Sequence, residues 1–193
     1  MSKKYLIVVD GQKDFVTGAL RNEEAIRTLP NLLKKVEETD PNKVMILATM
    51  DTHGPDYMNT LEGQKLPVPH CIKDTDGWHL VPELEKLLEQ KRSEVKDNRK
   101  PVTGVGVAYK PTFGSYELID SIYCEVEDTP VEFEICGYCT DICVVSNALM
   151  LRAAFPNAPI TVDASCCAGV TPEAHKAALT VMKSCQIDVV NED

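Results

Sequence analysis

The sequence predicts an α/β protein with three layers: a doubly wound, mostly parallel sheet of about six strands, with helices on both faces. Two observations support this fold. Short apolar runs rich in β-branched residues alternate along the chain with segments of helical periodicity, and several of the runs end in a charged residue. Strands that alternate with helices form right-handed crossovers, which place the strands parallel in one sheet.

The N-terminal part supplies two strands and two helices in order. The run YLIVVD ends at Asp10 and is followed by a turn and by a helical pattern from about Asn22 to Glu38. KVMILATMD repeats the strand pattern, and a charged helix is expected from about Val81 to Lys96. A segment rich in Gly, Pro, Asp and His separates them, from Thr52 to Trp78. A loop of that length is unusual enough to indicate function.

The rest of the chain continues the alternation with the strand-like runs GVGVAYK, VEFEICG, APITVDAS and QIDVVN. Helices are predicted at about Asp141 to Ala154 and at about Pro172 to Ser184. No internal repeat, low-complexity tract or linker divides the chain, and 193 residues suit one hydrophobic core. We therefore expect a single domain over residues 1–193.

Composition narrows the partners and the compartment. The formal net charge is −10 without a basic stripe, which disfavours nucleic acid and anionic membranes as partners. No apolar run reaches the ~18 residues of a membrane span, and the N-terminus MSKKYLIVVDGQKDF has acids where a secretory signal has its cleavage site. We expect a cytoplasmic protein whose eight cysteines are reduced, most of them as small buried side chains.

The densest group of cysteines lies in ICGYCTDICVVS, with Cys136, Cys139 and Cys143. An iron–sulfur site and a redox pair of Cys136 and Cys139 are both open, but the spacing matches no iron–sulfur motif and the pair would straddle a strand end. Cys143 follows Thr140 and Asp141, either of which can cap the next helix. Its thiol would lie in the first helical turn, where the helix dipole favours thiolate and free N–H groups can receive an oxyanion.

Two other strand ends carry ionisable side chains, Asp10 and Lys110. Because the carboxyl ends of parallel strands open onto the same crevice, both side chains can meet Cys143 there. A carboxylate in reach of a thiol can take its proton, while an ammonium group stabilises the resulting charges. Taken alone, each residue has an ordinary interpretation as a turn cap, a solvated charge or a buried cysteine.

Several stretches follow one another in an informative order: VVDGQKDF, ATMDTH, LPVPHCIKDTDGW, AYKPTFGSY, GYCTDICVVSNAL and TVDAS. In this order they resemble the isochorismatase-like cysteine hydrolases, and among these the nicotinamidases (pyrazinamidases) most closely. The resemblance covers most of the chain. It implies a catalytic triad of Asp10, Lys110 and Cys143, and a cis peptide bond between Tyr138 and Cys139. That bond would aim the backbone N–H of Cys139, with that of Cys143, at the developing oxyanion.

The resemblance also implies a divalent metal ion. Asp51 and His53 are two positions apart and point the same way in an extended chain, and His70 follows after a loop. Nicotinamidases bind their metal through a matching Asp, His and His, and Glu62 is a candidate for a further ligand. One carboxylate and two imidazoles suit zinc, with iron or manganese as alternatives.

The implied reaction is hydrolysis of a small carboxamide, nicotinamide first among them, to carboxylate and ammonia through a thioester on Cys143. Phe15 and Tyr116 are expected as aromatic walls of the substrate pocket, because Pro67 stands where many nicotinamidases have a tryptophan. The alternatives are a hydrolase of the same fold that acts on a carbamoyl or ureido compound, and a non-catalytic metal- or thiol-binding protein. The resemblance further implies a homo-oligomer.

Overall fold

The computed structural model describes residues 2–96, 104–126 and 129–192. Its centre is a six-stranded sheet with the order β3-β2-β1-β4-β5-β6, in which all neighbouring strands are parallel. The strands are β1 (Lys3–Val9), β2 (Val44–Asp51), β3 (Gly104–Lys110), β4 (Val131–Tyr138), β5 (Ile160–Ala168) and β6 (Asp188–Val190). The predicted sheet is therefore confirmed, and its strands are not mostly but entirely parallel.

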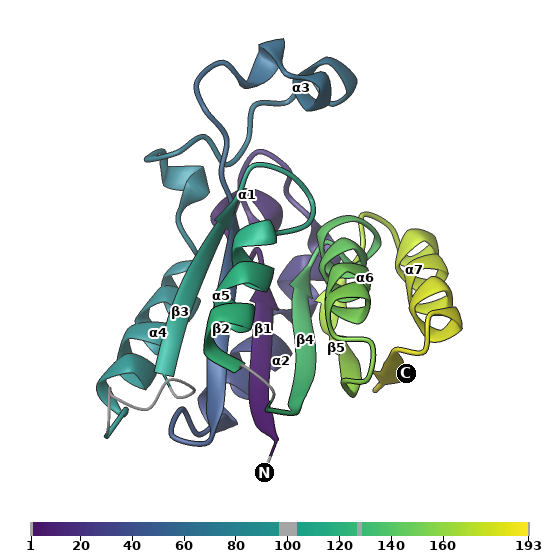
Figure 1. Cartoon of the computed structure of the whole chain (residues 1–193). Coiled ribbons are helices and arrows are strands. Elements are labelled where there is room, and N and C mark those ends of the chain that lie inside the picture. Colours follow the sequence, from purple (N-terminus) through teal and green to yellow (C-terminus); the bar gives the residue numbers. More distant parts are fainter. Residues whose placement is uncertain (1, 97–103, 127–128, 193) are drawn as a thin grey trace.

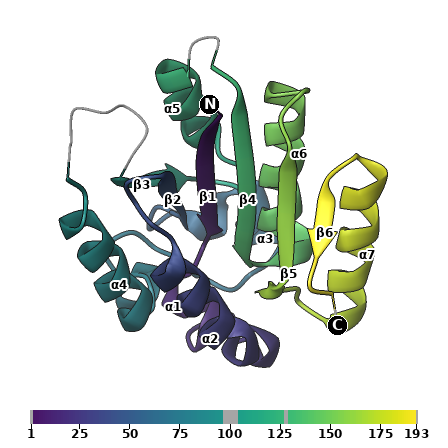
Figure 2. The same cartoon turned by 90° about the horizontal axis from the view of Figure 1, so that it is seen from below.

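Helices cover both faces of the sheet, as predicted. Helices α2 and α4 lie on one face and α5 and α6 on the other, and α7 packs beside α6 (Figures 1 and 2). The helices are α1 (Lys13–Val16), α2 (Glu23–Glu38), α3 (Leu61–Lys65), α4 (Pro82–Ser93), α5 (Tyr116–Val126), α6 (Val145–Ala154) and α7 (Pro172–Ser184). Within the described ranges, none of these helices combines the length and the apolar composition that a membrane crossing requires.

Helix α2 shows how the sequence determines an element. Asn22 caps it, because its side-chain oxygen accepts a hydrogen bond of 2.9 Å from the backbone N–H of Glu24. Ala25, Leu32 and Val36 recur at helical spacing and are completely buried, so one stripe of the helix packs on the sheet. The prediction of a helix from about Asn22 to Glu38 is confirmed.

Two helical features differ from the prediction. Helix α5 was not predicted, although its buried Leu118, Ile119 and Ile122 already have helical spacing. The helix predicted from Asp141 begins instead with a π-helical turn, η3 (Thr140–Val144), and becomes regular only at α6. Both differences fall in segments that flank the crevice at the carboxyl ends of the strands.

The strand order reverses between β1 and β4, where connections lead to β2 and β3 on one side and to β5 and β6 on the other. Ligands of such sheets bind at this switch point, beyond the carboxyl ends of the strands. The two strands approach closely there: Gly137 has a φ of 121°, and a Cβ atom on it would lie 2.0 Å from the carbonyl oxygen of Val9. The segment between β2 and α4, which includes α3, projects beyond these strand ends (Figure 1).

Candidate active site

Three ionisable side chains meet in the crevice beyond the strand ends. Asp10 follows β1, Lys110 ends β3, and Cys143 lies in the π-helical turn after β4. The Nζ atom of Lys110 is 2.7 Å from Asp10 Oδ2 and 3.4 Å from Cys143 Sγ. None of the three residues is more than 4% exposed. The structure thus brings together the residues expected as a triad, with the ammonium group between the carboxylate and the thiol.

Asp10 is fixed through one carboxylate oxygen and open at the other. Its backbone is left-handed, with a φ of 49°, and the hydroxyl of Thr49 donates a hydrogen bond of 2.7 Å to Oδ1. The other oxygen, Oδ2, forms an ion pair with Lys110 but accepts no well-formed hydrogen bond from any described residue. This buried oxygen is therefore available to accept the proton of the Cys143 thiol.

Burial controls the ionisation of these groups. It raises the pKa of the Asp10 carboxyl although Lys110 opposes the shift, and it raises the pKa of the Cys143 thiol well above the usual value. For Lys110 burial alone would lower the pKa, but attraction to Asp10 and Cys143 outweighs burial and raises it. Burial therefore disfavours the thiolate that the position at a helix end favours, while the Lys110 ammonium group opposes burial.

Two contacts with residues outside the π-helical turn hold it in place. The hydroxyl of Thr140 lies 2.8 Å from His175 Nδ1 in α7, and a carboxylate oxygen of Asp141 accepts a hydrogen bond of 2.9 Å from the backbone N–H of Val170. We expected Thr140 or Asp141 to cap the helix, but the N-cap position is occupied by Cys139, which forms no side-chain capping hydrogen bond. The turn is thus tied to the corner between β5 and α7.

The clustered cysteines have separate positions. The peptide bond between Tyr138 and Cys139 is cis, as the resemblance implied. Cys139 and Cys143 both line a cavity, whereas Cys136 is completely buried in the core. All eight cysteines are free.

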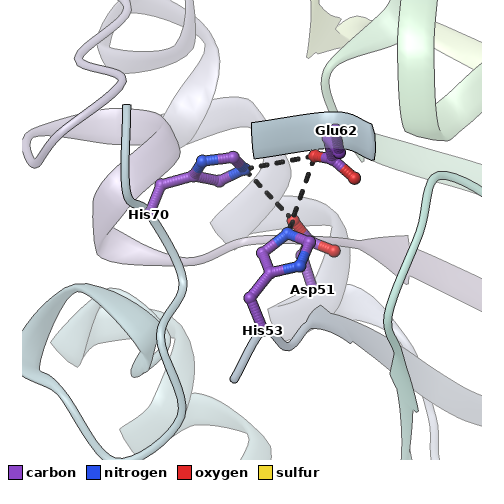
Figure 3. A group of neighbouring side chains, drawn as sticks. All are labelled: Asp51, His53, Glu62 and His70. Atoms are coloured by element: carbon purple, nitrogen blue, oxygen red, sulfur yellow. Dashed lines mark hydrogen bonds and ion pairs between the residues drawn. The ribbon is translucent and has the colours of Figure 1, made fainter. Parts of the chain in front are cut away.

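Four potential metal ligands converge (Figure 3), and one of them, Asp51, contacts Lys110 of the triad. Asp51 ends β2, His53 follows it, Glu62 lies in α3, and their ligand atoms and that of His70 all lie within 4.8 Å of one another. His53 Nε2 is 3.0 Å from Asp51 Oδ2, and His70 Nε2 is 3.7 Å from Glu62 Oε1. Bonds of roughly 2.0–2.2 Å to one metal ion place ligand atoms about 3–4 Å apart, so the spacing fits. His70 Nδ1 contacts the carbonyl oxygen of Val68, which turns Nε2 toward the group.

Two buried polar residues of the first motif position this ligand set, and sequence reasoning had given neither a role. The side chain of Gln12 accepts a hydrogen bond of 2.7 Å from the backbone N–H of Asp51 and donates one of 2.8 Å to its carbonyl oxygen. The carboxylate of Asp14 accepts a hydrogen bond of 2.7 Å from the N–H of Cys71, next to the candidate ligand His70. The sequence feature that could have indicated a role for Gln12 and Asp14 is their position within the motif VVDGQKDF.

Asp51 connects the ligand set to the triad. Its Oδ1 is 3.3 Å from Lys110 Nζ, while Oδ2 faces His53. Burial alone would raise the pKa of this carboxyl, but the two histidines and Lys110 outweigh burial and hold the pKa well below its usual range. Asp51 is therefore ionised, which metal binding requires.

A cavity of about 810 Å³ opens beside both groups. Phe15 lines it, with its ring edge-on to that of His70 at a centroid distance of 5.8 Å. Tyr116 does not: it begins α5, whose other side is buried, and is 78% exposed to solvent. Phe113, to which sequence reasoning gave no role, lines the cavity instead. The one sequence feature that could have indicated a role for Phe113 is its position within the motif AYKPTFGSY.

Comparisons with known proteins agree with this geometry. The family model described as the isochorismatase domain matches residues 4–101 and 126–193. A structure of the nicotinamidase/pyrazinamidase PncA of Bacillus subtilis is 26% identical, with a TM-score of 0.82 over 98% of this chain and 100% of that one. Another structure, of the nicotinamidase PncA of the same organism, is 25% identical, with a TM-score of 0.80 over 98% and 99%.

A more distant structure shares the fold. The pyrazinamidase of Pyrococcus horikoshii, solved in complex with zinc, is 24% identical, with a TM-score of 0.72 over 98% of this chain and 99% of that one. No curated protein matches the chain.

Proposed function

The chain belongs to the isochorismatase family, and we propose that it is a metal-assisted cysteine amidohydrolase that cleaves nicotinamide, or another small carboxamide, to carboxylate and ammonia. One observation carries the proposal: a buried ammonium group lies 3.4 Å from the Cys143 sulfur and 2.7 Å from the Asp10 carboxylate. The choice of nicotinamide is supported by the two Bacillus subtilis nicotinamidase structures, which match nearly the full length.

The first half of the reaction forms a thioester. The sulfur of Cys143 attacks the carboxamide carbon while its proton passes to Asp10 Oδ2, the carboxylate oxygen that pairs with Lys110 and accepts no well-formed hydrogen bond from the described residues. Burial raises the pKa of the Asp10 carboxyl, which makes its carboxylate a stronger base toward the thiol. Asp10 then gives this proton to the leaving ammonia. Lys110 remains protonated throughout and stabilises the negative charge on either partner.

The second half releases the acid. Asp10, again a carboxylate, takes a proton from a water molecule, whose oxygen attacks the thioester carbon. The C–S bond breaks, and the proton on Asp10 returns to the sulfur of Cys143. In both halves we assign the backbone N–H groups of Cys139 and Cys143 to the oxyanion, because both residues line the cavity at the reacting end.

The donor set fits a divalent metal ion. Two imidazoles and two carboxylates suit zinc, with iron or manganese as alternatives, and Asp51, His53, Glu62 and His70 would hold the ion. A bound metal supplies a Lewis acid at the cavity wall that can hold a ring nitrogen or a carbonyl oxygen of the substrate. Asp51 then has two tasks, since its other oxygen faces Lys110.

Ammonia release from nicotinamide by metal-loaded protein tests the proposal. Cys143→Ala should lower kcat by about a thousandfold or more, because the nucleophile is lost. Cys124→Ala, which removes an exposed thiol on α5, should leave kcat unchanged. Activity should also disappear on chelation and return with added metal. Undiminished activity in Cys143→Ala, or no ammonia from nicotinamide and a panel of other small amides, would reject the function.

A further inference from the structure

The cavity extends far beyond the groups that take part in the proposed reaction. Its volume of about 810 Å³ lies within the range of roughly 300–1,000 Å³ that holds drug-sized ligands, whereas nicotinamide has a single ring. The reactive groups line only one part of it. The rest of its apolar wall, here called the outer subsite, consists of Ala19, Leu20, Leu66, Phe113, Ile142 and Val170.

The outer subsite is apolar and accessible. Leu66, Phe113 and Val170 are 38%, 43% and 56% exposed, although large apolar side chains are usually covered when they converge. They come from three separate segments, which follow α3, β3 and β5. Apolar residues from distant segments that meet around a concave site, beside a few polar groups, are typical of ligand pockets.

Hydrogen bonds hold this wall in shape. Asn22 donates from its side chain to the carbonyl oxygen of Gly169 at 2.8 Å, which joins the segment before α2 to the segment before α7. The carboxylate of Asp14 accepts a hydrogen bond of 2.8 Å from the N–H of Ala19 and another of 2.7 Å from that of Cys71. The outer subsite is thus connected to the reacting end through fixed contacts, which lowers the cost of ordering it around a ligand.

The charged side chains at the edge of the cavity are paired with one another and do not favour an anionic ligand. Arg21 lines the cavity, but it already pairs with Glu23 at 2.8 Å. Glu24 lines the cavity as well and pairs with Arg27. Because both arginines are already neutralised by these carboxylates, a neutral ligand is favoured over a phosphate or a carboxylate.

We propose that the outer subsite binds a neutral, apolar substituent of the substrate, so that the preferred substrates are primary carboxamides larger than nicotinamide, such as aryl-substituted pyridine carboxamides. The carboxamide binds at Cys143 and the substituent packs against Phe113 and Val170. This inference rests on the proposed amidohydrolase function and names the substrate class of the same site.

Three compounds test it: nicotinamide, a phenyl-substituted nicotinamide and its carboxyphenyl analogue. We expect kcat/KM for ammonia release to be about tenfold or more higher for the phenyl compound than for nicotinamide, in line with what added apolar contacts contribute to specificity. The carboxyphenyl analogue, equal in size but anionic, should fall below the phenyl compound. Binding of the same compounds to metal-loaded Cys143→Ala, measured by calorimetry, gives the same order without turnover.

A pair of valine substitutions tests the location. Val170→Trp fills the outer subsite and should reduce the preference for the phenyl compound, expressed as the ratio of its kcat/KM to that of nicotinamide, by about tenfold. Val181→Trp is the matched control, because Val181 is 47% exposed on α7 and does not line the cavity. It should leave the ratio unchanged.

The outcomes separate this inference from the proposed function. Hydrolysis of nicotinamide without a preference for the phenyl compound, or equal effects of the two tryptophans, would overturn the outer subsite and leave the amidohydrolase standing. If neither these compounds nor the panel of other small amides releases ammonia but the phenyl compound still binds Cys143→Ala more tightly than nicotinamide, the amidohydrolase is rejected and the outer subsite is retained as a binding site for neutral apolar groups.

Discussion

The two halves of the candidate site are built in different ways. The triad lies at the ends of β1 and β3 and in the turn that follows β4, and the ion-paired residues Asp10 and Lys110 are 0% and 1% exposed. The ligand set starts at the end of β2 but takes Glu62 from the five-residue helix α3, where its side chain is 18% exposed. The reacting atoms thus depend on the sheet, whereas the ligand set depends on a projecting segment held by a few hydrogen bonds.

Lys110→Met removes the ammonium group of the triad and should have the largest effect on both stability and activity. Without the ammonium group the carboxylate of Asp10 remains buried with no cation, which costs about 3–5 kcal/mol of unfolding free energy. Ammonia release should fall about a thousandfold, because nothing stabilises the charge moving between thiol and carboxylate. Denaturant unfolding and kcat measure the two effects.

The matched control for this substitution is Lys91→Met. Lys91 in α4 is also buried and lies 3.2 Å from its partner Glu94. Because the side chain of Glu94 is largely exposed, the pair contributes about 1 kcal/mol or less to stability. Its removal should not affect kcat. Retention of wild-type activity in Lys110→Met would show that the reaction does not use the ammonium group.

Substitutions in the loop-built half should have intermediate and unequal effects. At a metal concentration of 100 times Kd the ion should stabilise the wild type by about 2.7 kcal/mol. His70→Ala should remove most of this gain, because His70 is 3% exposed and oriented by a backbone contact. Glu62→Gln should weaken binding about tenfold, or about 1.4 kcal/mol, because the amide still offers an oxygen. Titration calorimetry with zinc and unfolding with and without the metal measure both.

A histidine outside the ligand set provides the control for these two substitutions. His79→Ala, in the loop before α4, should leave zinc affinity and the metal-dependent gain in stability at their wild-type values. Equal losses of zinc affinity in His70→Ala and Glu62→Gln would contradict the expected difference between the two ligands. The carboxylate of α3 would then be as essential as the imidazole.

The same comparison explains what could be predicted from the sequence. Apolar runs that end in Asp10 and Lys110 predict parallel strands, and parallel strands bring their carboxyl ends together, so the meeting of these residues with Cys143 follows from topology. The ligand set depends on how a long segment folds, and no periodicity describes that fold. It was predicted only because Asp51 and His53 lie in motifs that resemble those of a known family.

The wrong prediction for Tyr116 also has a physical cause. Tyr116 was expected in the pocket because it is aromatic, but the phase of the unpredicted helix α5 turns it to solvent and leaves Phe113 at the cavity. This error concerns the side on which a residue lies, which depends on packing between distant segments.

The smallest predicted effect concerns the contact between Thr140, in the π-helical turn that carries Cys143, and His175 in α7. His175→Ala leaves the Thr140 hydroxyl without its 2.8 Å partner, so the turn that carries Cys143 should lose about 1 kcal/mol of stabilisation, seen as a roughly fivefold lower kcat with KM unchanged. Thr140→Val, which removes the other side of the contact, should have a similar effect. An increase in KM with kcat unchanged would instead place His175 in substrate binding.

The dependence on pH distinguishes this contact from simple packing. Burial lowers the pKa of His175, with Asp141 opposing and Arg27 reinforcing the shift, so the folded protein favours the neutral imidazole. A histidine whose pKa is lower in the folded than in the unfolded chain contributes stability that is complete above the unfolded value of about 6.5 and is lost as the pH falls through the interval below it. The unfolding free energy of the wild type should therefore decline more steeply below about pH 6.5 than that of His175→Ala. Parallel pH profiles of the two proteins would mean that the imidazole is equally free to take up a proton in both states, and that the turn is held by Asp141 and Val170 alone.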